Sequence, residues 1–210
     1  MINRKEKLTI SIKCGEEMKK SGFDLRREKK MKDIEEATLK LLNERDLSHI
    51  TIDEIAKGAG VSKVTIFNYY STKDNLINTS IHGSLASSQK ELETLVYSDL
   101  SFEQTYHEIT KYKMSRIHQY TPVFFHNLIK QFSSDPDFYN SNMQKENEEL
   151  VLKLFQKGRN EGKINPAYSD EVLLLYMHIF TEGMKSGDIP SENLKNYGTL
   201  ISQMFLNGLR

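Results

Sequence analysis

The stretch TIDEIAKGAGVSKVTIFNYYSTKDNL, residues 51–76, constrains the fold more than any other part of the chain. Thr51 and Glu54 stand three positions apart before an apolar pair, which is the spacing of a capping box at the start of a helix. Gly60 follows soon after, and glycine adopts the positive φ of a tight turn at little cost. The segment therefore predicts a short helix that ends at a sharp turn.

A second short helix is expected directly after this turn. Ser62 is suited to be its N-cap. Ala56 and Ala59 are small enough to let the two helices approach closely, and a shared core is supplied by Ile55, Val61 and Ile66. Two short helices that cross at a glycine turn form a helix-turn-helix, whose second helix can enter the major groove of DNA. A helical hairpin with no role in DNA binding is the alternative.

The side chains expected on the outside of the second helix suit contacts with DNA. Asn68 can pair bidentately with adenine, Lys63 can donate to base edges, and Val64 can contact a thymine methyl group. Nearby hydroxyl groups and Lys73 suit phosphate oxygens. The residues predicted to bind DNA are Thr51, Ser62, Lys63, Val64, Thr65, Phe67, Asn68, Tyr69 and Lys73.

This stretch resembles the DNA-binding domain of TetR-type (tetracycline-repressor-like) transcriptional regulators. The residues that agree with the family pattern in order and spacing are Thr51, Ile55, Ala56, Ala59, Gly60, Val61, Ser62, Thr65, Tyr69, Tyr70, Ser71, Lys73 and Leu76. The resemblance covers about residues 27–80, and the rest of the chain agrees with the family in length and helical class. Val64 and Phe67 depart from the pattern, which often has a small residue and a tyrosine at these positions.

The remainder of the chain reads as amphipathic helices separated by turns. Apolar residues recur at three- and four-residue spacing from about residue 25 to residue 45, and a further long helix is expected over 73–97. Proline and glycine residues divide the following segments, and no run of alternating β-branched residues with hairpin turns occurs. We therefore predict an all-α fold of about nine helices, with an N-terminal three-helix helix-turn-helix domain and a C-terminal helical bundle.

The charge is distributed unevenly along the chain. Residues 1–33 hold 11 basic and 6 acidic side chains, whereas residues 80–210 hold 13 basic and 16 acidic ones. A basic end on an acidic body fits a protein with one end facing a polyanion, and equally a lysine-rich tail that maintains solubility. The predicted organisation is a mobile basic arm (1–22), a helix-turn-helix DNA-binding domain (23–78) and a helical ligand-sensing and dimerisation domain (79–210).

The resemblance implies that the last two helices pair with a second subunit. The helix expected over 169–185 is apolar around most of its circumference, and such a helix is buried on both sides. The final helix, 192–209, has a broad apolar stripe, so a homodimer is expected, with a purely intramolecular core as the alternative. The predicted interface residues are Leu174, Met177, His178, Leu194, Tyr197, Ile201, Met204, Phe205 and Leu209.

The resemblance also implies a ligand pocket among the middle helices. An apolar cavity with a few polar groups would suit a small hydrophobic or amphipathic ligand, although each such residue is more often part of a plain core than of a ligand site. The predicted pocket residues are Tyr106, Tyr112, Met114, His118, Phe124, Phe125, Leu128, Phe132, Leu154, Tyr176 and Phe180.

Other classes of protein are disfavoured by the sequence. Cys14 is the only cysteine, and the six histidines form no metal-binding pair, so no metal and no cofactor are predicted. No apolar run approaches the ~18 residues that span a bilayer, and the N-terminus lacks the apolar stretch of a signal peptide. A cytoplasmic location without a membrane partner is expected. No known catalytic motif is present, which predicts that the chain is not an enzyme.

These observations together predict a sequence-specific DNA-binding transcriptional regulator. It would act as a ligand-responsive repressor, with a homodimer bound to a pseudo-palindromic operator. The alternative is a DNA-binding protein of the same fold that is controlled by a protein partner or acts architecturally, without a small-molecule inducer.

Overall fold

The computed structural model describes residues 21–134, 141–185 and 191–210. Within these ranges the chain forms nine α-helices, one 3₁₀ turn and no strand, which confirms the predicted all-α fold. The helices are α1 (Gly22–Glu44), α2 (Ile52–Ala59), α3 (Lys63–Tyr70), α4 (Lys73–Val96), α5 (Phe102–Gln119), α6 (Pro122–Ser134), α7 (Ser141–Asn160), α8 (Asp170–Lys185) and α9 (Ser191–Gly208), and the 3₁₀ turn η1 (Leu47–His49) follows α1.

The first helix begins three residues earlier than expected. Ser21 and Asp24 form a capping box, in which the Ser21 hydroxyl accepts from the Asp24 N–H at 3.2 Å and the Asp24 carboxylate accepts from the Ser21 N–H at 3.1 Å. Of the predicted mobile arm, residues 1–22, the first twenty residues lie outside the described part of the chain. Its last two residues belong to the start of α1.

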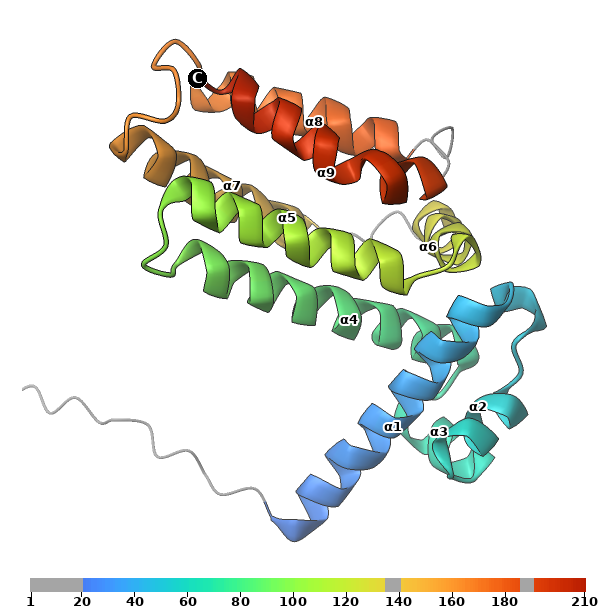
Figure 1. Cartoon of the computed structure of the whole chain (residues 1–210). Coiled ribbons are helices and arrows are strands. Elements are labelled where there is room, and N and C mark those ends of the chain that lie inside the picture. Colours follow the sequence, from blue (N-terminus) through green and yellow to red (C-terminus); the bar gives the residue numbers. More distant parts are fainter. Residues whose placement is uncertain (1–20, 135–140, 186–190) are drawn as a thin grey trace, which may run out of the picture.

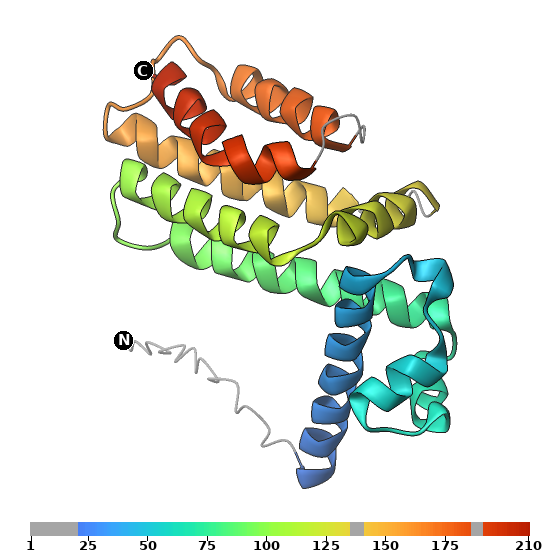
Figure 2. The same cartoon turned by 45° about the vertical axis from the view of Figure 1, so that its right-hand side comes forward.

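The helices are arranged as a bundle with a smaller head at one end. In Figure 1, α4, α5, α7, α8 and α9 lie roughly side by side, and α1, α2 and α3 extend from the end of the bundle where α6 lies. The turned view in Figure 2 also shows α1 running away from the bundle at a steep angle. Helix α4 belongs to both parts, because Leu76, Ile77 and Ile81 are buried in the head and Val96 is buried in the core of the body.

The core of the head contains one aromatic side chain from α6. Phe124 is buried together with residues of α1, α2 and α3, among them Ile34, Ile55 and Ile66. The Phe124 ring stacks on Tyr120 with centroids 3.9 Å apart. The head is therefore packed against both α4 and α6 of the body, rather than joined to it by a single helix.

Hydrogen bonds from α6 bind the C-terminal end of α1, and we call this contact the α1–α6 joint. The Asn127 side chain, 1% exposed, donates to the carbonyls of Leu42 (2.8 Å) and Arg45 (2.9 Å) and accepts from the Leu47 N–H (2.9 Å). Thr121 donates its hydroxyl to the Asn43 carbonyl at 2.6 Å and its N–H to the Asn43 side chain at 2.7 Å. These bonds satisfy backbone groups that the end of a helix leaves unpaired.

Replacing Asn127 by leucine tests the energetic weight of the α1–α6 joint. The substitution keeps the side chain's size but leaves two carbonyls and one N–H buried without a partner, so we expect the free energy of unfolding to fall by about 3 kcal/mol. Urea denaturation followed by circular dichroism measures this change. The control is Asn160→Leu on the exposed side of α7, where a change within about 0.5 kcal/mol is expected. Equal effects of the two substitutions would contradict the assigned role of Asn127.

Candidate functional site

The first helix of the helix-turn-helix is fixed by its two ends. At the start of α2, the Thr51 hydroxyl accepts from the Glu54 N–H at 3.3 Å, and the Glu54 carboxylate accepts from the Thr51 N–H at 3.0 Å. The hydrogen bonds from Thr51, and then the nearby Arg45, hold the pKa of Glu54 below its usual range. At the other end, Gly60 has φ 65° and caps the helix in the left-handed conformation. The predicted turn therefore lies where the sequence placed it.

Helix α3 has one face in the core and one face in solvent. Ile66 and Tyr70 are buried, and the Tyr70 hydroxyl donates to the Glu35 carboxylate at 2.9 Å. On the other face, Val64 is 66% and Phe67 is 47% exposed. Lys63 and Asn68 are exposed beside them. Figure 1 shows that α3 lies on the side of the head that faces away from the bundle, so this face is open to a large partner.

Several of the residues predicted to bind DNA already have partners within the head. Lys63 forms an ion pair of 2.7 Å with Asp53 of α2, and both side chains are more than half exposed. The Ser62 hydroxyl caps α3 by accepting from the Thr65 N–H at 3.1 Å, and the two hydroxyls lie 2.9 Å apart. The Thr51 hydroxyl also donates to Glu54 at 2.8 Å. These hydroxyl groups cap the N-terminal ends of α2 and α3.

Lys73 lies at the start of α4, as the sequence predicted, but it has a contact that the sequence did not predict. Its ammonium donates to the Leu47 carbonyl at 3.0 Å, so the side chain ties the start of α4 to the turn after α1. Just before it, Ser71 has φ 61° and ψ −44°, and the Thr72 N–H donates to the Tyr70 carbonyl at 2.6 Å. This tight, strained γ-turn changes the direction of the chain between α3 and α4.

A basic stretch on α1 adds to this end of the molecule. Five basic residues occur between positions 26 and 32, and residues 21–30 are exposed. The Arg27 guanidinium lies 5.6 Å above the ring of Tyr69, the half-buried α3 residue predicted to contact DNA. The sequence showed this run of lysine and arginine at the start of a predicted helix, but it did not show that the run lies beside α3.

Comparison with known proteins agrees with this geometry. Residues 34–79 match the family described as bacterial regulatory proteins, tetR family. This match identifies a TetR-type DNA-binding segment in residues 34–79. The matched family is one of regulatory proteins, in agreement with the DNA-binding regulator that the sequence predicted.

The curated relatives match part of the chain in sequence, and solved structures share its fold. The HTH-type transcriptional regulator YxbF of Bacillus subtilis is 30% identical over 113 residues, which cover 47% of this chain and 29% of the relative. EthR of Mycobacterium tuberculosis is 34% identical over 55 residues, which cover 26% of each protein. The chain thus spans less than a third of the length of these curated relatives. A TetR regulatory protein from Mycobacterium vanbaalenii has the same fold, with a TM-score of 0.60 at 14% identity over 90% of this chain and 99% of that one.

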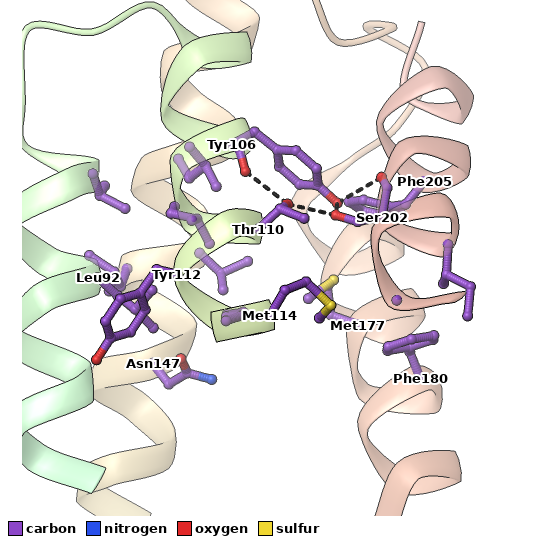
Figure 3. A pocket seen from close by; sticks show the side chains of 18 of the residues that line it. Leu92, Tyr106, Thr110, Tyr112, Met114, Asn147, Met177, Phe180, Ser202 and Phe205 are labelled. Atoms are coloured by element: carbon purple, nitrogen blue, oxygen red, sulfur yellow. Dashed lines mark hydrogen bonds between the residues drawn. The ribbon is translucent and has the colours of Figure 1, made fainter. Parts of the chain in front are cut away.

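The body of the chain contains a pocket of about 500 Å³. Side chains from α4, α5, α7, α8 and α9 line it, and most of them are apolar (Figure 3). Gly198 of α9 allows close packing here, because a Cβ at this position would lie 2.5 Å from the Met114 sulfur. The pocket therefore lies between the middle helices and the last two helices.

The pocket includes about half of the residues that the sequence assigned to it. Those that line it are Tyr106, Tyr112, Met114, Leu154, Tyr176 and Phe180. The assignments of Phe124 and Leu128 were wrong, because α6 turns its apolar side toward the core of the head. Two further predicted residues do not line the pocket: Phe125 packs edge-on against Tyr120, and His118 is exposed. The side chain of Phe132, the last predicted residue, lies outside the described residues.

The pocket also contains polar residues that the sequence analysis did not select. Thr110, Lys113 and Arg116 of α5 line it, together with Asn147 of α7 and Ser202 of α9. Thr110 and Lys113 follow Tyr106 at successive spacings of four and three residues, so the sequence could have placed them on the same face of α5 as Tyr106. Asn147 and Ser202 carried no such signal, because their positions depend on how α7 and α9 pack.

The residues predicted for the dimer interface fall on two sides of α8 and α9. Tyr197, Met204 and His178 are exposed, and Leu174 is half-buried. The remaining assignments need correction, because Met177 and Ile201 line the pocket, Phe205 packs on the body core and Leu209 is 2% exposed within it. The Leu194 side chain lies outside the described residues. Exposed apolar residues that the prediction omitted are Val172, Leu175, Ile179 and Leu200.

In the described part of the chain, no three histidine, cysteine or acidic side chains come together in a way that could hold a metal ion. None of the described helices combines the length and the apolar character that crossing a bilayer requires.

The left-handed conformation of Gly60 gives a prediction about the turn that sets the angle of α3. A Cβ at this position would meet no neighbouring atom, so the cost of Gly60→Ala is the cost of the backbone conformation alone, about 1 kcal/mol. Thermal unfolding measures the loss. Gly208→Ala is the matched control, because that glycine is helical and equally uncrowded, and alanine should leave stability unchanged or slightly raised. A Gly60→Ala protein as stable as the control would refute the prediction.

Proposed function

We propose that this chain is a sequence-specific DNA-binding transcriptional regulator of the TetR family, acting as a homodimeric, ligand-responsive repressor on a pseudo-palindromic operator. The observation that carries the proposal is the solvent-facing side of α3, where Lys63, Val64, Phe67 and Asn68 are exposed together. The opposite side of the same helix is buried, which holds α3 firmly on the head. Repression is the commoner mode in the resembled family.

In this proposal α3 enters the major groove and its exposed side chains read base edges. Asn68 pairs with adenine through its carboxamide, and Val64 and Phe67 contact thymine methyl groups. Lys63 exchanges its ion pair with Asp53 for a base or phosphate, at small cost because an exposed ion pair of this kind contributes about 1 kcal/mol or less. Ser62, Thr65, Thr51, Tyr69 and Lys73 lie around this face and are proposed to contact phosphates.

The basic stretch of α1 extends the proposed interface. Residues 26–32 lie on the part of α1 that projects from the head, as Figures 1 and 2 both show. Phosphate contacts from such residues add affinity that is independent of sequence and sensitive to salt. The contact between Arg27 and Tyr69 supports α1 and α3 acting as one surface.

Substitution of Asn68 tests base reading by α3. An operator is first obtained by selecting genomic fragments with the purified protein. Asn68→Ala should then weaken binding to that operator about tenfold to a hundredfold and relax the preference at one base pair in each half-site. Binding to unrelated DNA should change little. Fluorescence anisotropy at fixed salt measures both, with Asn160→Ala on α7 as the control. Operator binding indifferent to Asn68→Ala would contradict the proposed reading face.

The exposed apolar side chains of α8 and α9 support a homodimer. Among the residues whose burial is described, eight of the thirteen large exposed apolar ones belong to these two helices: Val172, Leu175, Tyr176, Ile179, Phe180, Tyr197, Leu200 and Met204. A concentration of apolar surface of this kind is typical of a protein interface. A second copy of the chain is the proposed occupant, because two-fold symmetry would place the same two helices of the partner against it. Two recognition helices would then face the two half-sites of a pseudo-palindrome.

A charge placed in the middle of this apolar face should separate the subunits. Met204→Glu introduces a carboxylate at a side chain that is 73% exposed in the single chain, so it should leave the protomer folded. We expect a monomer by light scattering, and loss of operator binding because one half-site contributes too little affinity. Tyr97→Glu is the control, since Tyr97 is also an exposed apolar residue but lies at the end of α4. A Met204→Glu protein that stays dimeric would rule out this interface.

The pocket favours a ligand-responsive regulator over one that lacks a small-molecule inducer. Its volume of about 500 Å³ is within the range of small-molecule sites, roughly 300–1,000 Å³. A ligand would change DNA binding only through different affinities for two arrangements of the heads. Stoichiometric release of operator DNA on filling the pocket is the expected behaviour.

A further inference from the structure

One face of α5 supplies the polar side of the pocket. Tyr106, Thr110, Lys113 and Ile117 line it, and their three- and four-residue spacing places them in one row along the helix. The opposite walls, formed by α7, α8 and α9, are mainly apolar and aromatic. A ligand in this pocket therefore meets an apolar environment with polar groups concentrated along α5.

The hydroxyl groups in this row are already paired with α9. The Tyr106 hydroxyl donates to the Ser202 carbonyl at 3.1 Å and accepts from the Ser202 hydroxyl at 2.9 Å. The Thr110 and Ser202 hydroxyls lie 2.7 Å apart. Figure 3 shows these three side chains joined to each other, with Asn147 lying apart from them. They hold α5 to α9 and leave little unsatisfied capacity for a ligand.

The charges around the pocket are all of one sign. Lys113 and Arg116 line it, and none of the described lining residues is Asp or Glu. Arg116 donates only to uncharged groups: the hydroxyls of Tyr120 (2.7 Å) and Ser84 (3.0 Å) and the Gln119 carboxamide (2.9 Å). The pocket wall thus carries two positive charges that no acidic lining residue neutralises.

Lys113 is the group that remains without a partner. Its side chain lines the pocket and is accessible to solvent, and among the described residues nothing accepts a hydrogen bond from its ammonium or forms an ion pair with it. Desolvation by the surrounding protein lowers the pKa of this ammonium. A cation beside apolar walls and without an acidic neighbour favours an anionic ligand.

We propose that the pocket binds an amphipathic carboxylate, with the apolar part between α5, α7 and α8 and the carboxylate on the ammonium of Lys113. A charge-assisted hydrogen bond of this kind is stronger than one between neutral groups, particularly away from water. The Asn147 carboxamide, on the α7 side of the pocket, offers a further donor. This inference rests on the proposed ligand-sensing function and specifies the class of ligand.

Calorimetric titration of the full-length protein with three ten-carbon probes of different charge tests the proposal. Decanoate is the anion, decan-1-ol the neutral probe and decyltrimethylammonium the cation. The wild-type protein should bind decanoate at least about tenfold more tightly than either of the others, because only decanoate pairs with Lys113. Lys113→Met should abolish this preference while retaining the affinity for decan-1-ol. Lys111→Met is the matched control, since Lys111 lies on the exposed side of α5 and should leave the preference unchanged.

No decanoate binding by the wild type, equal binding of the three probes, or a preference that survives Lys113→Met would overturn the proposal. Operator binding without any probe is measured in parallel. Loss of the charge preference with intact operator binding refutes only the ligand class, whereas a protein that selects decanoate but no operator refutes the proposed function.

Discussion

Hydrogen bonds from one buried amide, Asn127, join the head of this molecule to α6 of the body. They pair the last carbonyls of α1 with α6, and Thr121 and Asn43 extend the same contact. Phe124, one turn earlier in α6, enters the apolar core of the head. The α1–α6 joint therefore satisfies backbone groups and buries apolar surface at one place, and the orientation of α3 follows from it through the packing of α1 on α2 and α3.

The same contact gives a physical route between the pocket and the head. Arg116 lines the pocket and donates to the Tyr120 hydroxyl at 2.7 Å, and its guanidinium lies 5.1 Å above the Tyr120 ring. The Tyr120 ring in turn stacks on Phe124. Together with α4, which belongs to both cores, this chain of contacts connects the two parts that a ligand-responsive regulator must couple. In the proposed mechanism, a ligand acts by favouring one arrangement of these contacts over another.

Features that depend on residues a few positions apart could be predicted from the sequence. Contacts between segments far apart in the chain could not. The capping box at Thr51, the turn at Gly60 and the exposed face of α3 each depend on residues a few positions apart, so the helix-turn-helix could be derived. The contact of Lys73 with Leu47 joins residues 26 positions apart. Phe124 and Leu128 were assigned to the pocket because their apolar character does not show which core they enter. For the same reason, the broad apolar stripe of α9 did not separate the inward Leu209 from the outward Met204.

The structure of the protein bound to a selected operator is the most direct test of the account. We expect two protomers on each operator, with their α3 helices in successive major grooves about 34–36 Å apart. Asn68 should lie at base edges, the apolar faces of α8 and α9 should cover each other, and the α1–α6 joint should keep its hydrogen bonds. A single protomer on the operator, or α3 outside the groove, would contradict the account.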